Sequence, residues 1–182
     1  CFSPSAVALA ILLCAVTLVS ALSGCAPSDS DLLGYQSREL SVRLRGSMNG
    51  VEFCATLSLG EPTDGEIRSF RLEMTAPETL KGVVYKRGAD NRLVASVGTV
   101  ECELGALGVG ESVVYLANAF SIAGAPESIN AIDGKSMGLS DLDRLTRLDF
   151  DAYTVYLDAK SDLPVRIDGK EWELSVSVEV IE

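Results

Sequence analysis

LSVRLRGSMNGVEFCATLSL, residues 40–59, carries the clearest structural pattern in this sequence. Apolar and polar residues alternate over positions 40–44 and again over 51–57. Alternation with a period of two is typical of a strand with one buried face. Asn49 and Gly50, which both tolerate positive φ, separate the two alternating runs. The stretch therefore predicts an antiparallel β-hairpin with a two-residue turn.

The same alternation recurs along most of the chain. It is found in RSFRLEM (68–74), around Val83–Arg87 and Arg92–Val97, in Thr99–Leu104, in LDFDAYTVYLD (148–158) and in EWELSVSVEV (171–180). This pattern predicts an antiparallel sheet with one packed and one solvated face. In the last run the single tryptophan, Trp172, falls on the apolar face, which favours core packing over contact with a ligand.

Helical periodicity is much rarer than strand periodicity in this chain. In ESVVYLANAFSI, residues 111–122, apolar residues recur at helical spacing, and glycines precede and follow the segment. SDLDRLTRL, residues 140–148, is a second candidate helix with Ser140 and Asp143 placed as a capping pair, unless it leads directly into the strand that follows. The predicted fold class is α+β: a strongly curved antiparallel sheet, an open half-barrel, with one or two helices covering its concave face.

The beginning of the chain differs sharply from the rest. Residues 1–24 contain no charged side chain, although the 182 residues together have a formal net charge of −11. AVALAILLCAVTLVSAL, residues 6–22, is an apolar run of the signal-peptide type, shorter than the roughly 20 residues of a membrane-spanning helix. It ends in Leu22-Ser23-Gly24-Cys25, which resembles a bacterial lipobox. We expect a signal peptidase to recognise the first three residues and a lipid to be attached to Cys25.

The predicted organisation follows from the lipobox. It consists of a lipoprotein signal peptide (1–24), a lipid-anchored polar tether (25–36) and a half-barrel lipoprotein domain (37–182). Each methylene of an acyl chain contributes roughly 0.8 kcal/mol to membrane anchoring, so two or more chains on Cys25 would hold the protein at the membrane. The expected location is the extracytoplasmic face of the cell membrane. The alternative is a simple N-terminal anchor or a secreted protein in which Cys25 has no special role.

The acidic balance argues against two classes of partner. A nucleic acid requires a stripe of Lys and Arg to neutralise its phosphates, and an anionic bilayer attracts basic segments. A chain with 15 basic and 26 acidic residues is expected to use its charge mainly for solubility. We therefore expect no nucleic-acid partner, and contact with the membrane only through the lipidated cysteine.

Two cysteines, Cys54 and Cys102, belong to the predicted domain. Cys54 falls on a polar strand face, whereas Cys102 shares its face with apolar residues. Two separate packed thiols are therefore the favoured interpretation. A disulfide between them, which an oxidising compartment would permit, is the alternative.

No familiar catalytic arrangement is complete in the sequence. The chain has no histidine, which removes His-based triads and the commonest general base. GKSMG, residues 134–138, matches G-x-S-x-G, but a nucleophile elbow also requires a His partner and a strand–turn–helix setting. The same residues resemble the end of a P-loop, but Ile129 stands where its first glycine is required. We expect no enzymatic activity and no cofactor.

Acidic side chains gather in the last third of the chain, at Asp141, Asp143, Asp149, Asp151, Asp158 and Asp162. Asp149, Asp151 or Asp158 could contribute to a site for a hard cation. The spacing is not that of an EF-hand, and alternating carboxylates usually lie on a solvated strand face. Solvation is the favoured interpretation, so we expect no metal site.

Three stretches of the sequence resemble a known family of envelope proteins. They are the hairpin after the lipobox, FRLEMTAPETLKGVVYKRGADNRLVAS (70–96) and YTVYLDAKSDLPVRI (153–167). The order of strands and Pro-containing turns is similar to that of the Lol-type outer-membrane lipoprotein carriers and LppX-like half-barrel proteins, which include small lipoproteins of Firmicutes. The chain departs from the family at Asp162, where a glycine before Leu-Pro is more usual. The resemblance implies a concave apolar face that can hold an acyl chain or another hydrophobic ligand.

The predicted function is that of a lipid-anchored extracytoplasmic lipoprotein that binds a hydrophobic ligand, a lipid or a lipoprotein acyl chain, without catalysis. The sequence does not assign the ligand-binding residues or a protein partner. The alternative is a structural or interaction lipoprotein whose sheet edge or acidic face docks another protein of the cell envelope. An open apolar cleft would favour the first function, and an exposed apolar patch on the outer face would favour the second.

Overall fold

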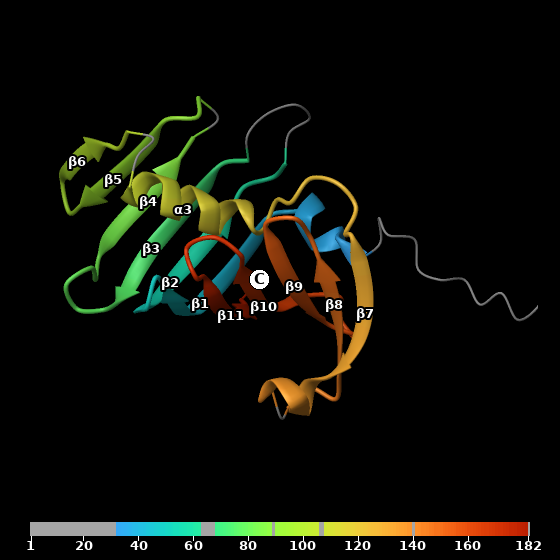
Figure 1. The fold of residues 1–182 in the computed structure, drawn as a ribbon. Coiled ribbons are helices and arrows are strands. Elements are labelled where there is room, and N and C mark those ends of the chain that lie inside the picture. Colours follow the sequence, from blue (N-terminus) through green and yellow to red (C-terminus); the bar gives the residue numbers. More distant parts are fainter. Residues whose placement is uncertain (1–31, 63–67, 89, 106–107, 140, 182) are drawn as a thin grey trace, which may run out of the picture.

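The structure of the protein is a computed structural model that describes residues 32–62, 68–88, 90–105, 108–139 and 141–181. The predicted signal peptide and the lipobox, including Cys25, lie outside these residues. In the part of the chain that is described, all strands belong to one antiparallel sheet of eleven strands, in the order β6-β5-β4-β3-β2-β1-β11-β10-β9-β8-β7 (Figure 1).

The strands are β1 (Leu40–Met48), β2 (Val51–Leu59), β3 (Phe70–Ala76), β4 (Val83–Arg87), β5 (Leu93–Val97), β6 (Val100–Glu103), β7 (Ser128–Asp133), β8 (Arg144–Asp149), β9 (Tyr153–Asp158), β10 (Pro164–Gly169) and β11 (Ser175–Val180). The α-helix α3 (Val109–Asn118) connects β6 to β7, and two short 3₁₀ helices, η1 (Gly34–Ser37) and η2 (Gly134–Met137), complete the described elements. We call β2–β6 the N-terminal wing and β7–β10 the C-terminal wing of the sheet.

The predicted hairpin at residues 40–59 is confirmed as β1 and β2. Leu44 lies opposite Ala55, so the apolar residues of both strands share one face of the sheet. Asn49 and Gly50 form the turn with φ values of 49° and 74°. Two consecutive positive φ values define the type I′ turn, whose twist matches that of the flanking strands.

The centre of the sheet joins the two ends of the described chain. β1 pairs with β2 on one side and with β11 on the other, with Val42 opposite Val180. Gly46 lies opposite Val176, and a Cβ at Gly46 would be 2.0 Å from the carbonyl oxygen of Ser175. Only glycine therefore permits this approach of the two backbones. The sheet is open, because β6 and β7 lie at its two edges and do not pair with each other.

One face of the sheet carries the core, and α3 lies across it (Figure 1). The apolar side chains of this face include Val42, Leu44, Ala55, Leu57, Leu72, Val155 and Ile167, all between 0% and 2% exposed. Burial of one such aliphatic side chain stabilises the fold by about 1.5–3 kcal/mol. The opposite face is polar and carries cross-strand ion pairs such as Arg43 with Glu179, at 2.7 Å. The alternation in the sequence thus separates a core face from a solvated face.

The predicted α+β class with one or two helices is wrong. The described chain is mostly antiparallel sheet, and α3 is its single α-helix. Residues 144–149 of the second candidate helix form β8, which pairs with β7 and β9. Leu145 and Leu148, three residues apart, are both fully buried, although a strand directs them to opposite faces. Their spacing thus reflects a strand covered on both faces and not one side of a helix.

The packed part of the chain includes residues that precede β1. Leu32 and Tyr35 are buried in the core with 6% and 2% of their surface exposed. Burial raises the pKa of the Tyr35 phenol to about 12. At least these residues of the segment 25–36 therefore pack against the sheet.

The two domain cysteines lie far apart in the sheet. Cys54 is on β2 and Cys102 is on β6, with three strands between them, and both thiols are free. Cys54 is half-buried, as expected for a packed thiol. Cys102 is exposed, so the prediction that it is packed is wrong. The reason is that β6 is an edge strand whose four residues are all exposed.

No helix among the described residues is both long enough and apolar enough to cross a membrane.

Candidate functional site

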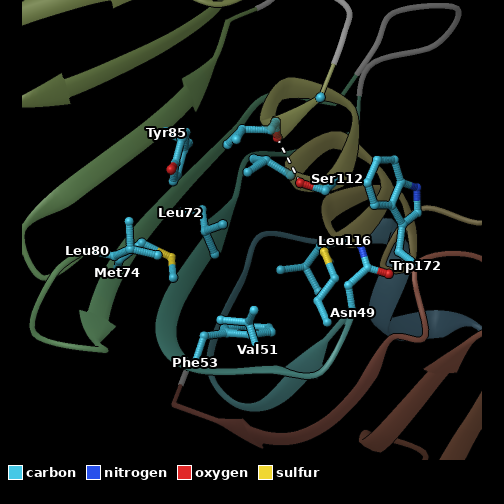
Figure 2. Close-up of a pocket in the computed structure, with 14 residues that line it drawn as sticks. Asn49, Val51, Phe53, Leu72, Met74, Leu80, Tyr85, Ser112, Leu116 and Trp172 are labelled. Atoms are coloured by element: carbon cyan, nitrogen blue, oxygen red, sulfur yellow. Dashed lines mark hydrogen bonds between the residues drawn. The ribbon is translucent and has the colours of Figure 1, made fainter.

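An apolar cleft lies between the first turns of α3 and the strands β1–β4. Its volume is about 330 Å³, and it opens to solvent. Fourteen residues line it: Met48, Asn49, Val51, Phe53, Leu72, Met74, Leu80, Tyr85, Gly108, Val109, Ser112, Val113, Leu116 and Trp172. Figure 2 shows these side chains around the space beneath the helix.

The cleft has a buried floor and an exposed mouth. Leu72 and Leu116, on the sheet and the helix respectively, are each 2% exposed. By contrast, Val51 and Val109 are each 57% exposed. Exposed valines of this kind are costly in water unless something covers them. Apolar side chains thus line the cleft from its buried floor to its exposed mouth.

The N-terminal end of α3 covers the cleft but is weakly fixed by local interactions. Its N-cap residue, Gly108, has a φ of 70° and provides no side-chain cap. Ser112 lies one turn further on, and its hydroxyl donates to the carbonyl oxygen of Val109 at 2.9 Å. This hydroxyl therefore makes its hydrogen bond within the helix and not across the cleft.

The C-terminal end of α3 is anchored by two buried arginines, Arg68 and Arg87. The Arg68 guanidinium donates to the carbonyl oxygens of Phe120 (3.2 Å), Gly60 (2.8 Å) and Arg38. Together these bonds join the end of the helix to both flanks of the hairpin.

Arg87 completes this anchor from β4. It donates to the side-chain oxygen of Asn118 at 3.3 Å and to the carbonyl oxygen of Arg68 at 3.2 Å. Its guanidinium also lies over the ring of Phe70, 5.0 Å from the centroid, where the cation is attracted to the π-face.

Both arginines are held by dipoles and not by carboxylates of the described residues. Burial lowers the pKa of both guanidinium groups. The last turn of a helix carries a partial negative charge, which favours a cation there. The anchored end of α3 is therefore electrostatically matched to its two arginines.

Trp172 is placed differently from the sequence-based prediction. The strand β11 begins at Ser175, and Trp172 lies in the preceding turn with a φ of 60°. Glu173 also has a positive φ, of 42°. Left-handed backbone at a bulky residue is unfavourable by about 1–3 kcal/mol and persists where the surrounding structure imposes it. Here the backbone N–H of Asn49 donates a hydrogen bond to the carbonyl oxygen of Trp172 at 2.8 Å. This bond fixes the turn to the hairpin, and the indole lines the cleft.

The polar groups that line the cleft are all uncharged. They are the Asn49 amide, the Ser112 hydroxyl, the Tyr85 phenol and the Trp172 indole. Burial raises the pKa of Tyr85, so its hydroxyl is protonated at neutral pH. Within the described residues, the Tyr85 hydroxyl has no hydrogen-bond partner, and it remains available to a ligand.

The other half of the core face is filled by aromatic side chains. The rings of Tyr115, in the last turn of α3, and Tyr153, on β9, stack with their centroids 4.6 Å apart. The hydroxyl of Tyr115 donates to the carbonyl oxygen of Ala152 at 2.8 Å, and that of Tyr153 donates to the carbonyl oxygen of Tyr115 at 2.8 Å. A Cβ at Gly169 would lie 2.7 Å from the Tyr115 ring, which shows how closely this part is packed.

The motif GKSMG forms η2 and its C-cap, outside the cleft. Ser136 is exposed, and its hydroxyl donates to the carbonyl oxygen of Asp133 at 2.6 Å. Gly138 ends this turn with a φ of 75°. The motif is thus a short 3₁₀ turn at the end of an edge strand and not a strand–turn–helix elbow.

The acidic cluster is distributed over several turns and strand ends. Asp149 accepts hydrogen bonds from Arg147, Thr154 and Ser128. Burial by itself raises the pKa of this carboxyl, but the three hydrogen bonds outweigh burial and hold the pKa below its usual value. Asp158 accepts from Ser161 at 2.7 Å. The described residues contain no group of three or more Cys, Asp or Glu side chains arranged to hold a metal ion.

Comparison with known proteins gives distant structural similarities, and two of them are described here. No protein family model matches the chain, and no curated protein sequence matches it. A DUF1329 family protein from Desulfovibrio piger is similar in structure, with a TM-score of 0.39 and 11% identity over 81% of this chain and 75% of that chain. MucB is similar with a TM-score of 0.35 and 15% identity over 86% of this chain and 57% of that chain. The resemblance of the sequence to Lol-type carriers stays a prediction.

Proposed function

We propose that the protein binds a hydrophobic ligand, such as a lipid acyl chain, in the cleft beneath α3. The observation that carries the proposal is the cleft itself, a space of about 330 Å³ lined almost entirely by apolar side chains and open to solvent. Pockets for small ligands usually measure about 300–1,000 Å³ and have few polar groups. Beside the last turn of α3 the same face is occupied by Tyr115 and Tyr153, whose ring centroids lie 4.6 Å apart.

The energetics favour an aliphatic occupant. Each methylene that enters the cleft contributes about 0.8 kcal/mol, and covering Val51 and Val109 removes further apolar surface from water. The flexible Met48 and Met74 adapt to chains of different shape, because methionine has many low-energy conformations. A cleft of this kind suits a single acyl chain better than a rigid polar molecule.

The proposed setting is the cell envelope, with Cys25 lipidated and the domain on the extracytoplasmic face of the membrane. The role we propose is binding without catalysis, since the chain has no histidine and Ser136 lies in an exposed turn. We do not favour the alternative of a docking lipoprotein. Away from the cleft, the largest exposed apolar side chains of the described residues include Val97 and Val100, which form one cross-strand pair at the end of the β5–β6 hairpin.

Native mass spectrometry combined with lipid extraction tests the proposal. The full chain with Cys25→Ser would be purified from a bacterial envelope, because this substitution removes the proposed lipid anchor. We expect a co-purifying lipid close to one per protein. The variant Ser112→Phe, which adds a ring above the cleft, should lose it.

Ser136→Phe is the matched control, because it adds the same ring at an exposed serine of η2. This variant should retain the lipid. A clean protein mass for the Cys25→Ser chain, together with no uptake of added lipid, would contradict the proposed function and favour an anchored interaction domain.

A further inference from the structure

We infer that the cleft selects ligands whose polar group is uncharged, such as an ester, hydroxyl or amide, over ligands with a carboxylate or phosphate. The inference rests on the proposed function and names the chemical class of its ligand. It begins from the polar atoms that line the cleft and from the charges that surround its mouth.

None of the fourteen lining residues is charged. An anionic group that leaves water requires a cation or several hydrogen-bond donors to replace its hydration. The two buried arginines, Arg68 and Arg87, do not provide this, because they anchor the other end of α3 and do not line the cleft. A buried anion would therefore lose its hydration without a compensating charge.

The neutral polar groups are placed so that they can bind the head group of an amphiphile whose chain lies in the cleft. Asn49 and Trp172 lie side by side at the mouth, joined by the hydrogen bond between their backbones. The Asn49 amide both donates and accepts, and the Trp172 indole donates, which matches a carbonyl or hydroxyl group. Tyr85, on β4, is 7% exposed and offers one further hydroxyl; Figure 2 shows it on the other side of the cleft from Trp172.

The surroundings of the mouth are unfavourable for negative charge. Glu171 and Glu173 flank Trp172 in the chain. The first turn of α3 also borders the cleft, and a helix N-terminus favours an anion, but Glu111 already places a carboxylate in that turn. Lys81 follows Leu80 and Lys170 precedes Glu171 in the chain, so Glu111, Glu171 and Glu173 stand against two basic residues.

The experiment compares three ligands with lauroyl or dodecyl chains: 1-monolauroylglycerol, laurate and dodecyltrimethylammonium. Each would be titrated into the full chain carrying Cys25→Ser below the concentration at which it forms micelles. Trp172, the single tryptophan of the chain, reports binding through its fluorescence, and calorimetry gives the affinity. We expect the neutral glycerol ester to bind at least about tenfold more tightly than laurate, and the ammonium compound is the control of opposite charge.

A gain-of-charge variant makes the test independent of folding defects. Ser112→Lys places a cation over the cleft without breaking a contact between elements, because the Ser112 hydroxyl bonds only to its own helix. The affinity of this variant for laurate relative to monolauroylglycerol should be about tenfold higher than that of the original chain. Ser112→Gln is the matched uncharged control and should keep the original order of affinities.

The outcomes separate this inference from the proposed function. Failure of all three ligands to bind would overturn the proposed function and, with it, the inference. Binding of laurate as tightly as the neutral ester would leave the proposed function standing and overturn the inference. An unchanged affinity for laurate relative to monolauroylglycerol in Ser112→Lys would also contradict it, because added charge at the mouth would then have no influence.

Discussion

The core face of the sheet has a hollow half and a filled half, and both are covered by the same helix. The hollow half is the cleft under the first turns of α3, on β1–β4. The filled half lies beside the last turn of α3 and the C-terminal wing, where Tyr115 stacks on Tyr153. The strands of the two halves differ as well: β2 and β3 alternate between buried and less buried residues, whereas the first five residues of β9 are all buried. The helix adds to this difference, because it places Tyr115 against β9 but presents the small Ser112 to the cleft.

The two halves also differ in how the helix is fixed. Arg68 and Arg87 bind the C-terminal end of α3 to the sheet. The N-terminal end begins at Gly108 without a side-chain cap. One helix thus has a fixed end over a packed core and a less constrained end over an open cleft. The comparison teaches that strand patterning makes an apolar face, whereas individual helix side chains decide whether that face is filled.

The largest expected effect is on the free energy of unfolding of two Leu→Ala variants, one in each half of the core face. Leu148→Ala, in the fully buried interior of β8, should lower the free energy of unfolding by about 4 kcal/mol. Leu80→Ala, at the partly exposed wall of the cleft, should lower it by about 1 kcal/mol, because the space beside it is already empty. Urea unfolding followed by circular dichroism measures both values. Equal costs would show that the two halves are packed alike.

The second expected effect concerns the anchored end of α3. Arg68→Met should lower the free energy of unfolding by about 3 kcal/mol, because it leaves buried carbonyl oxygens at Gly60 and Phe120 without a donor. Arg71→Met, which removes an exposed ion pair with Glu73, is the control and should cost about 0.5 kcal/mol or less. The same urea titration measures both. A small cost for Arg68→Met would mean that the helix is held by its apolar contacts alone.

The third expected effect is a loss of stability in alkaline solution. Tyr35 packs near Arg68, and burial raises its pKa to about 12, whereas an unfolded tyrosine titrates near about 10. Between these pH values the folded protein holds more protons than the unfolded chain. The stabilisation is thus complete below pH 10 and is lost as the pH rises through 12, by roughly 2 kcal/mol for Tyr35.

Unfolding midpoints between pH 8 and pH 12 would measure this loss, and Tyr35→Phe should reduce the slope. Burial also raises the pKa of the other four tyrosines, so the variant should keep part of the slope. An identical slope in Tyr35→Phe would contradict the assignment to Tyr35.

The smallest expected effects on stability come from a matched pair of Tyr→Phe variants, each of which removes one hydroxyl. Tyr153→Phe should cost about 1 kcal/mol, because the Tyr153 hydroxyl donates to the carbonyl oxygen of Tyr115 in the filled half. Tyr85→Phe should change stability by less than about 0.5 kcal/mol, since its hydroxyl has no partner in the described chain. Thermal unfolding of both variants gives the comparison. A larger cost for Tyr85→Phe would indicate that its hydroxyl is already used within the fold.

Sequence reasoning succeeded where local signals were sufficient. The hairpin β1–β2 combines alternation with an Asn-Gly turn, and both signals act within 20 residues. It failed at residues 144–149, where partners on both sides of β8 override the capping pattern. It also did not anticipate β7, because this edge strand is exposed on both faces and lacks alternation. The local sequence pattern does not show which strands pair when they are far apart in the chain.

The cleft was less predictable than the fold. A concave apolar face was expected, but which part of it stays empty depends on side chains from four strands, a turn and a helix. Trp172 was assigned to a strand because alternation continues through it, and neither Trp nor Glu signals a left-handed turn. The buried Arg87 had a visible signal: it follows Val83 and Tyr85 on the apolar face of β4. A charged residue at a strand position where the alternation calls for an apolar one indicates that the fold provides specific hydrogen-bond partners for it.

The pairing of β1 with β11 has a consequence for the order in which the protein can be assembled. The strands β1–β6 follow one another in the chain and can pair as soon as each has been synthesised. One side of β1, however, stays without its neighbour until residues 175–180 exist. During this interval a row of amide and carbonyl groups in the middle of the future sheet is open to other strands. Contacts over such sequence separations also form slowly. The last strand of the described chain therefore completes the pairing of β1.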